Sequence, residues 1–382
     1  MTLDIKKDLP EVFEEFGEAR QKAFLKVKEF KDQDIRLIGI YCTFFPQEIA
    51  LAAGASVVGL CSTGEEGIAD AEVDLPKNLC PLIKSSYGLA KTDKCPFFHF
   101  SDLVIGETTC DGKKKMYELM EEFKPVHIMQ LPNRNDDLGL AMWEEEIRRC
   151  IAKVEEVFGV EITEEKLREA IKLQNEIRSA NKELFEVMKA DELPMTGMEL
   201  WKVLEGEQFT FDRTQIPQMF RDLKGRVGAE SQHITGRPRI LVTGCPIGAS
   251  THKVIEAIEN NGGIVVAFEN CGGAKAKYTN VDESDPDPIH AIAKKYLSIG
   301  CACINHNQSR FDLLDVMIDD YKVDGVVDMH LQTCTPYQVE GTAIKRFCNE
   351  EKHVPYIAID TDYSQSDLGQ LNTRLGAFLE ML

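Results

Sequence analysis

The sequence predicts an α/β protein built from two domains with mainly parallel sheets, joined by a helical region. Short apolar runs bounded by turn residues alternate with helical patterns, as in parallel sheets whose strands are connected by helices. A stretch of long helical patterns divides these runs into an earlier and a later series. At 382 residues the chain is also too long for one small core. The predicted domains are therefore 1–135, 136–235 and 236–382.

The first domain begins with apolar residues at helical spacing over residues 9–31, which predicts an amphipathic helix. Four apolar runs then predict strands, namely "IRLIGIYC", "SVVGLC", "SDLVIGETTC" and "PVHIMQLP". Between the first two strands, "PQEIALAAG" predicts a helix that starts at Pro46 and stops at Gly54. This order is that of a β-α series with a parallel sheet.

The middle region carries long helical patterns from about residue 136 to residue 190. The segment "TEEKLREAIKLQNEIRSANKELFEVMKA" is rich in good helix formers, and Thr163 is expected to start it as a capping box. Residues 191–235 are mixed in composition and punctuated by glycine. The sequence therefore predicts a helical connection over 136–235.

The third domain repeats the pattern of the first. Its predicted strands are "GRPRILVTGCP", "GIVVAFENC", "VDGVVDMHLQTC" and "VPYIAID", with helices expected at 251–261 and 288–297. Two such series predict two Rossmann- or flavodoxin-like domains.

Composition excludes several classes of function. The formal net charge of −20 and the pI near 4.9 oppose binding to the phosphate backbone of nucleic acids. No apolar run approaches the roughly 18–20 residues that span a bilayer, and the N-terminal residues lack the apolar core of a secretory signal. We expect a cytoplasmic protein without nucleic-acid or membrane partners.

The twelve cysteines are the most informative residues. A reducing compartment argues against a disulfide framework, so metal, cluster or redox chemistry is expected, with core filling as the alternative. Half of the cysteines end predicted strands, where parallel sheets bind their ligands. These are Cys42, Cys61, Cys110, Cys245, Cys271 and Cys334.

The other six cysteines have less uniform positions. Cys80 precedes a proline that opens a predicted helix, which directs its sulfur at a helix N-terminus. Cys301 and Cys303 are two residues apart, so an extended segment would turn both to the same side. Cys150 and Cys348 lie within helical patterns and are expected to pack in the core, whereas Cys95 is undecided.

Spacing narrows the kinds of site that these cysteines could form. No CxxC occurs, which disfavours structural zinc, and a ferredoxin-like run of closely spaced cysteines is missing too. Neither a GxGxxG turn after a strand nor a GxxxxGK[ST] loop is present. An iron–sulfur cluster would therefore draw its thiolates from distant segments across a cleft between domains.

Five segments carry a resemblance to a known family. They are "YCTFFPQEIALAAGA", "NLCPLIKSSYG", "GETTCDGKKKMYELM", "HLQTCTPYQVE" and "DTDYSQSDLGQLNTRLGAFLEML". Together they resemble the 2-hydroxyacyl-CoA dehydratase and benzoyl-CoA reductase superfamily over nearly the whole chain. Within it the chain is most similar to the double-cubane cluster proteins, single-chain relatives with extra cysteines.

The resemblance implies a ligand set. Three dehydratase cysteines hold a 4Fe-4S cluster, and their motifs correspond to Cys80, Cys110 and Cys334. The double-cubane branch implies an 8Fe-9S cluster with three thiolates per cubane. Cys42 and Cys271, which end strands, and Cys303, from the same-side pair, complete the predicted set. The reserve candidates for these three ligands are Cys301, Cys245 and Cys61.

The resemblance also implies an activity and partners. A separate ATP-hydrolysing iron–sulfur activator would supply electrons of low potential, and the chain, as an anaerobic homodimeric reductase component, would reduce a small substrate. One alternative is a 2-hydroxyacyl-CoA dehydratase subunit, a lyase with a single 4Fe-4S cluster. Another is an electron-transfer protein without its own catalysis. Four residues stand next to the proposed cysteine motifs and are therefore candidate proton donors, although structural roles explain them better. They are Glu107, Lys84, His330 and Glu269.

Overall fold

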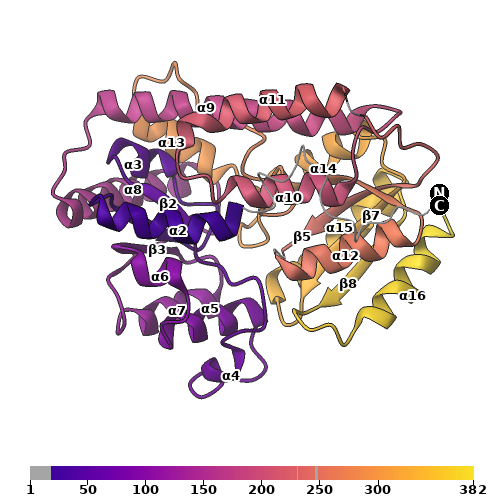
Figure 1. Ribbon diagram of the computed structural model, residues 1–382, viewed down its shortest axis with the longest axis horizontal. Helices are drawn as coiled ribbons and strands as arrows, with labels where there is room; N and C mark the ends of the chain where they lie inside the picture. Colours follow the sequence, from indigo (N-terminus) through magenta and orange to yellow (C-terminus); the bar gives the residue numbers. More distant parts are fainter. Residues whose placement is uncertain (1–18, 230, 246–247) are drawn as a thin grey trace.

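The computed structural model describes residues 19–229, 231–245 and 248–382. Two four-stranded sheets, each with all of its strands parallel, form separate halves of the molecule (Figure 1). The predicted α/β class with two parallel sheets is confirmed. The domain boundaries at 135 and 235 stay predictions.

Every predicted strand is present, although most are shorter than the apolar runs that predicted them. The first sheet contains β1 Leu37–Ile40, β2 Ser56–Gly59, β3 Leu103–Glu107 and β4 Val126–Met129. The second contains β5 Arg239–Gly244, β6 Ile264–Phe268, β7 Gly325–Leu331 and β8 Tyr356–Thr361. The central strands and β6 are largely buried, as expected of sheets covered by helices, whereas the edge strands β2, β4 and β8 are mostly half-buried.

The helices follow the predicted pattern. In the first half they are α2 Ala19–Asp32, α3 Gln47–Ala52, α4 Ile68–Ala71, α5 Pro81–Lys91, α6 Pro96–Phe100 and α7 Asp111–Met120. The middle region has α8 Asp137–Phe158, α9 Glu164–Phe185, α10 Gly197–Glu207 and α11 Ile216–Ala229. The last part has α12 Ala249–Asn260, α13 Pro288–Leu297, α14 Gln308–Asp320, α15 Thr335–Arg346 and α16 Leu368–Leu379.

Two local predictions are corrected. Thr163 does cap α9 by accepting a hydrogen bond from the Lys166 amide (3.3 Å), but a lysine at the third helical position cannot return the bond of a capping box. The segment around Cys301 and Cys303 is a turn rather than an extended strand, closed by the Ile304 amide on the Cys301 carbonyl (2.8 Å). For the helix predicted over 9–31, α2 is the described part, and residues 9–18 lie outside the described residues.

Strand order places the functional edge of each sheet. The orders are β2-β1-β3-β4 and β6-β5-β7-β8. Successive strands are therefore added first on one side of β1 and then on the other, and the same reversal of strand order occurs between β5 and β7. In open parallel sheets, ligands bind beyond the carboxyl ends of the strands at such a switch point. Cys42 and Cys110 follow the first pair of strands, and Cys245 and Cys334 follow the second.

Helices from the middle of the chain join the halves. Helices α9 and α11 lie side by side along one side of the molecule, in magenta and pink (Figure 1). The core of the first half includes Trp143 of α8, Ile171 of α9 and Ile292 of α13. Helix α13 is therefore packed against the first half although it belongs to the C-terminal part of the sequence.

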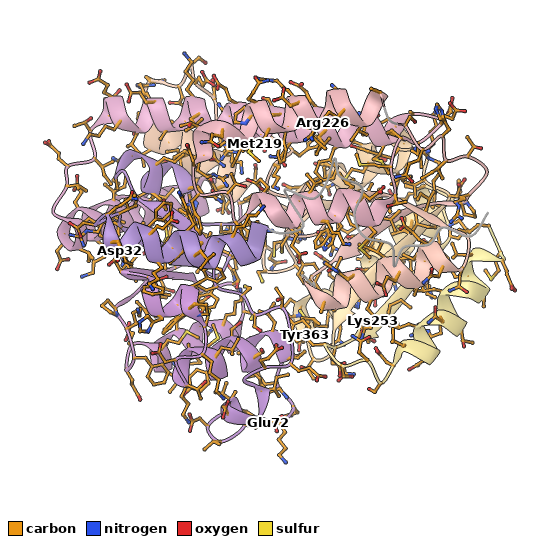
Figure 2. All side chains as sticks on the ribbon, viewed as in Figure 1. Asp32, Glu72, Met219, Arg226, Lys253 and Tyr363 are labelled. Carbon is orange, nitrogen blue, oxygen red and sulfur yellow. The ribbon has the colours of Figure 1, made fainter. Side chains whose placement is uncertain are left out.

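Direct bonds also tie the halves together. Tyr363, labelled in Figure 2 where the two halves meet, donates a hydrogen bond to the Ser62 carbonyl (3.0 Å). The Ala249 amide donates to the Thr63 carbonyl (3.2 Å). Within the described part of the chain, no helix is long and apolar enough to cross a membrane.

Candidate functional site

A cavity of about 1430 Å³ lies between the two halves. Nine of the twelve cysteines line it, and both halves contribute them. They are Cys42, Cys61, Cys80, Cys110, Cys245, Cys271, Cys301, Cys303 and Cys334. All six predicted ligands and all three reserves thus surround one space, although more than 290 positions separate the first of them from the last.

Three of these cysteines begin helices. Cys80, Cys110 and Cys334 are the N-cap residues of α5, α7 and α15. Their sulfurs lie where free amides and the helix dipole favour a thiolate. Burial, helped by the nearby Cys334 and Cys110 thiols, raises the pKa of Cys80 to about 12, although first-turn amides of α5 oppose the rise. These three cysteines therefore lie within electrostatic range of one another.

Cys334 has a further partner in Cys245. Its hydrogen bond with Cys245 lowers the pKa of Cys334, whereas burial and the same bond raise the pKa of Cys245. Cys245 also accepts a hydrogen bond from the Leu331 amide (3.5 Å). Cys245 accordingly belongs with the group of helix-capping cysteines.

A second group gathers around the end of β6 and the turn before α14. Burial raises the pKa of Cys42, and Cys271 and Cys301 contribute to the rise. A hydrogen bond with Cys303 lowers the pKa of Cys301 and raises that of Cys303. The cavity thus contains two neighbouring groups of thiols that also act on each other, since Cys110 contributes to the raised pKa of Cys303.

Cys61 is held differently from the rest. Its Sγ donates to the Tyr41 carbonyl (3.1 Å) and lies 3.8 Å from the Lys113 Nζ. Lys113 also donates to the Tyr41 carbonyl (2.7 Å), so it turns into the cavity. The next two lysines instead pair on the surface, Lys114 with Asp111 (2.6 Å) and Lys115 with Glu118 (2.8 Å).

The three cysteines outside the cavity have structural roles. Cys150 and Cys348 are fully buried in the cores, which confirms the predicted packing. Cys95 caps α6 by accepting a hydrogen bond from the Phe98 amide (3.4 Å).

The four candidate proton donors lie behind the cavity wall, since none of them lines it. Lys84 would be a solvated residue of α5 by its sequence position alone, but it is buried and pairs with Glu72 (2.8 Å). Glu269 accepts a bond from Thr243 (2.5 Å), and His330 lies 3.0 Å from an Asp328 oxygen.

Glu107 differs from the other three candidates. It is fully buried at the end of β3, and neither carboxylate oxygen has a hydrogen-bond partner among the described residues. Burial raises the pKa of Glu107 to about 8, although Lys113 opposes the rise. The carboxyl therefore holds its proton at neutral pH, near Cys42 and Cys61.

Several residues that sequence reasoning missed complete the site. The Tyr337 hydroxyl lies 3.5 Å from the Cys301 Sγ and accepts a bond from the Lys275 Nζ. Arg310 covers the Tyr337 ring, with 4.8 Å between the guanidinium carbon and the ring centroid. Tyr337 lies three residues after Cys334, within the "HLQTCTPYQVE" motif, and Lys275 lies four residues after Cys271. No sequence signal links Arg310 to a cysteine, because the folded chain alone brings it to the site.

The donor set fits an iron–sulfur cluster better than a single ion. Among the described residues, no three His, Cys, Asp or Glu side chains converge tightly enough to hold one metal ion. Thiols are the ligands of iron–sulfur clusters, and here they are spread around a large space with helix amides beside them. Cys42, Cys80, Cys110, Cys271, Cys303 and Cys334 would hold such a cluster.

Comparison with known proteins agrees with the resemblance. The family model for the 2-hydroxyglutaryl-CoA dehydratase D-component matches residues 42–382. The chain is 54% identical over 379 residues to the "Putative dehydratase subunit YjiM" of Escherichia coli (strain K12), covering 98% of this chain and 99% of that protein.

More distant relatives come from two kinds of enzyme. The (R)-phenyllactyl-CoA dehydratase beta subunit of Clostridium sporogenes is 23% identical over 380 residues, with 97% of each chain covered. One of the subunits of the benzoyl-CoA reductase of Thauera aromatica is 22% identical over 379 residues, with 94% of each chain covered. The chain therefore belongs to the 2-hydroxyglutaryl-CoA dehydratase D-component family, within the dehydratase and benzoyl-CoA reductase superfamily that its motifs indicated.

Proposed function

We propose that the chain is the reductase component of an ATP-dependent iron–sulfur system and carries a double-cubane 8Fe-9S cluster. The observation that supports this proposal is the convergence of nine cysteines on one cavity in two groups. A single cubane would use one group of three thiolates and leave the other group unexplained.

The proposed ligands of one cubane are Cys80, Cys110 and Cys334, and those of the other are Cys42, Cys271 and Cys303. Cys301 is the alternative to Cys303, because the two share a hydrogen bond and both line the cavity. When bound, the cluster would supply one-electron chemistry spread over several irons and sulfides.

The surrounding residues would tune and protonate the site. The first-turn amides of α5, α7 and α15 and the Lys113 ammonium favour negative charge at the sulfurs. The Tyr337 hydroxyl orients Cys301, and the protonated Glu107 carboxyl holds a proton close to the thiols. Electrons would come from a separate ATP-hydrolysing activator, and the substrate would be a small molecule. We also propose a homodimer.

The second candidate function is a 2-hydroxyacyl-CoA dehydratase subunit with one 4Fe-4S cluster. The dehydratase names of the relatives favour it. Iron and acid-labile sulfide, counted in anaerobically purified protein, separate the two: about eight irons per chain support the double cubane, and about four support the dehydratase.

Cysteine variants test the ligand set directly. Cys110→Ser should lose most of the cluster absorbance and iron, whereas Cys150→Ser, a buried cysteine outside the cavity, should keep both. Full retention of iron by Cys110→Ser would refute the assignment. Comparing Cys301→Ser with Cys303→Ser identifies which of the two is a ligand.

Turnover tests the enzymatic part of the proposal. Protein mixed with its activator and ATP should reduce a small oxidant, and the rate should depend on ATP. Reduction of the cluster without turnover of any oxidant would instead indicate an electron-transfer protein.

A further inference from the structure

The cavity has a second wall made of charged and polar residues rather than cysteines. Its cationic lining contrasts with the net charge of −20 of the chain. The lysines and arginines that line the cavity are Lys113, Arg178, Arg213, Lys277 and Lys295, whereas the acidic lining residues are Asp111, Glu207 and Glu340. Positive charge is therefore concentrated inside a strongly acidic protein.

Most of these cations already have acidic partners. Glu207 pairs with Lys277 (2.8 Å) and with Arg213 (2.9 Å). Arg178 of α9 pairs with the buried Glu48 of α3 (2.6 Å). These ion pairs engage all three cations, although Glu207 balances the charge of only one of its two partners.

Two of the five cations, Lys113 and Lys295 of α13, have no ion-pair partner among the described residues. Lys113 is already held by the Tyr41 carbonyl and Cys61, which leaves Lys295. The residue is 4% exposed and lines the cavity. Its Nζ donates to one acceptor, the Ala276 carbonyl (2.8 Å), and no described carboxylate lies within ion-pair distance. An ammonium has three N–H donors, so hydrogen-bonding capacity remains unused at a buried position.

The groups that face Lys295 provide no carboxylate that could balance an ammonium there. Arg178 approaches from α9, Glu48 from α3 and the Tyr296 ring from its own helix, with 4.1 Å between the Lys295 Nζ and the ring centroid. Glu48 balances only Arg178. Burial and then Arg178 lower the pKa of Lys295 well below its usual range, whereas Glu48 raises it.

Gln174 supplies an independent sign of a missing ligand. It lies one turn before Arg178 on α9, is 6% exposed and also lines the cavity. Its buried Oε1 has no hydrogen-bond partner among the described residues. Since a half-turn of the amide exchanges oxygen and nitrogen, Gln174 can present a donor to an anion.

We infer that Lys295 and Gln174, backed by Arg178, form a subsite for the carboxylate of a small organic acid, in the same cavity as the cysteines. The ammonium supplies the charge-assisted bond, and the amide supplies a second, neutral bond. A bound carboxylate balances the Lys295 ammonium, uses its spare hydrogen-bonding capacity and gives the Gln174 amide a partner. The inference deepens the proposed function, on which it rests for the identity of the ligand as substrate.

Binding should be coupled to protonation. Burial lowers the pKa of Lys295 in the empty site and a bound carboxylate would raise it, so acetate binding should be accompanied by proton uptake. Titration calorimetry of the anaerobic protein in two buffers of different ionisation enthalpy measures this uptake. Acetamide, which matches acetate in size without its charge, should bind far more weakly.

Variants locate the subsite. Lys295→Met should raise the Kd for acetate roughly 10- to 100-fold and abolish the proton uptake. Gln174→Leu should raise the Kd roughly threefold to tenfold and leave the uptake intact. Lys294→Met, which removes an exposed lysine of the same helix, should change neither value.

Iron content and the circular dichroism of each variant confirm folding, and Gln174→Leu tests the subsite if Lys295→Met does not fold. Absence of acetate binding to the wild-type protein, equal binding of acetamide, or unchanged binding in Lys295→Met would overturn the inference. About four irons per chain with intact acetate binding would refute the double-cubane cluster but not the carboxylate subsite. About eight irons per chain without acetate binding would refute the carboxylate subsite but not the double-cubane cluster.

Discussion

Replacement of Glu107 by glutamine should stabilise the protein, and increasingly so as the pH rises. Glu107 is fully buried, and both of its carboxylate oxygens are without hydrogen-bond partners among the described residues. Glutamine has nearly the same shape but cannot ionise. The substitution therefore removes the free-energy cost of protonating this carboxyl on folding while it keeps the volume filled.

The magnitude follows from the shifted pKa. Burial raises the pKa of Glu107 from 4.5 to about 8, and each unit corresponds to about 1.4 kcal/mol. Because the folded pKa is raised, the contribution of the protonated carboxyl to stability is complete below pH 4.5 and is lost as the pH rises through 8. Between pH 5 and pH 8 the wild-type protein should lose about 3 kcal/mol relative to Glu107→Gln.

Urea unfolding of both proteins at several pH values between 5 and 8 measures this difference as the shift between their midpoints. Glu118→Gln on the exposed face of α7 serves as the control and should show no such trend. A constant difference between wild-type protein and Glu107→Gln over this range would refute the reasoning, because it would mean that Glu107 ionises as readily when folded as when unfolded.

Three further predictions concern Lys113, which lines the cavity, and two buried residues that support the surrounding structure. Arg310→Met should lower the free energy of unfolding by about 3–5 kcal/mol, measured by urea unfolding at pH 7, since Arg310 is fully buried among three carboxylates. Gly88→Ala should destabilise α5 and reduce iron binding, measured as iron per chain, because a Cβ at Gly88 would overlap the Gly67 carbonyl. Lys113→Met should slow alkylation of Cys61, followed by mass spectrometry, since Lys113 lowers the pKa of that thiol against the effect of burial.

Surface variants provide the controls. Arg346→Met and Lys115→Met, both at exposed positions, should change stability by no more than about 0.5 kcal/mol and leave alkylation unaffected. Wild-type stability in Arg310→Met, wild-type iron content in Gly88→Ala, or unchanged alkylation of Cys61 in Lys113→Met would each contradict the corresponding argument.

The local pattern of apolar and turn residues was enough to predict the two parallel sheets and the positions of the cysteines at the ends of their strands. A buried parallel strand is a short apolar run whatever lies around it, so the runs ending at Cys42, Cys110, Cys245 and Cys334 predicted both the sheets and their functional edges. Proline after Cys80 likewise predicted the start of α5. These features depend on neighbours in the sequence, which is why they could be recognised without coordinates.

Pairings between distant segments were decided by the tertiary structure alone. Nothing near Lys295 or Gln174 marks either residue as part of a cavity wall, because helix periodicity shows that a face is buried but not what it faces. The turn at Cys301 and Cys303 shows the same limit, since both thiols reach the cavity by a backbone path that spacing did not predict.

Protonation is the clearest case of what only the folded structure decides. The sequence by itself determined that a carboxyl stands at the end of a strand before Cys110, and it placed three lysines after that cysteine. Only the fold left Glu107 without partners among the described residues and turned Lys113 inward while Lys114 and Lys115 stayed at the surface. The physical reason is that desolvation and charge proximity act through space, over distances that the order of residues does not encode.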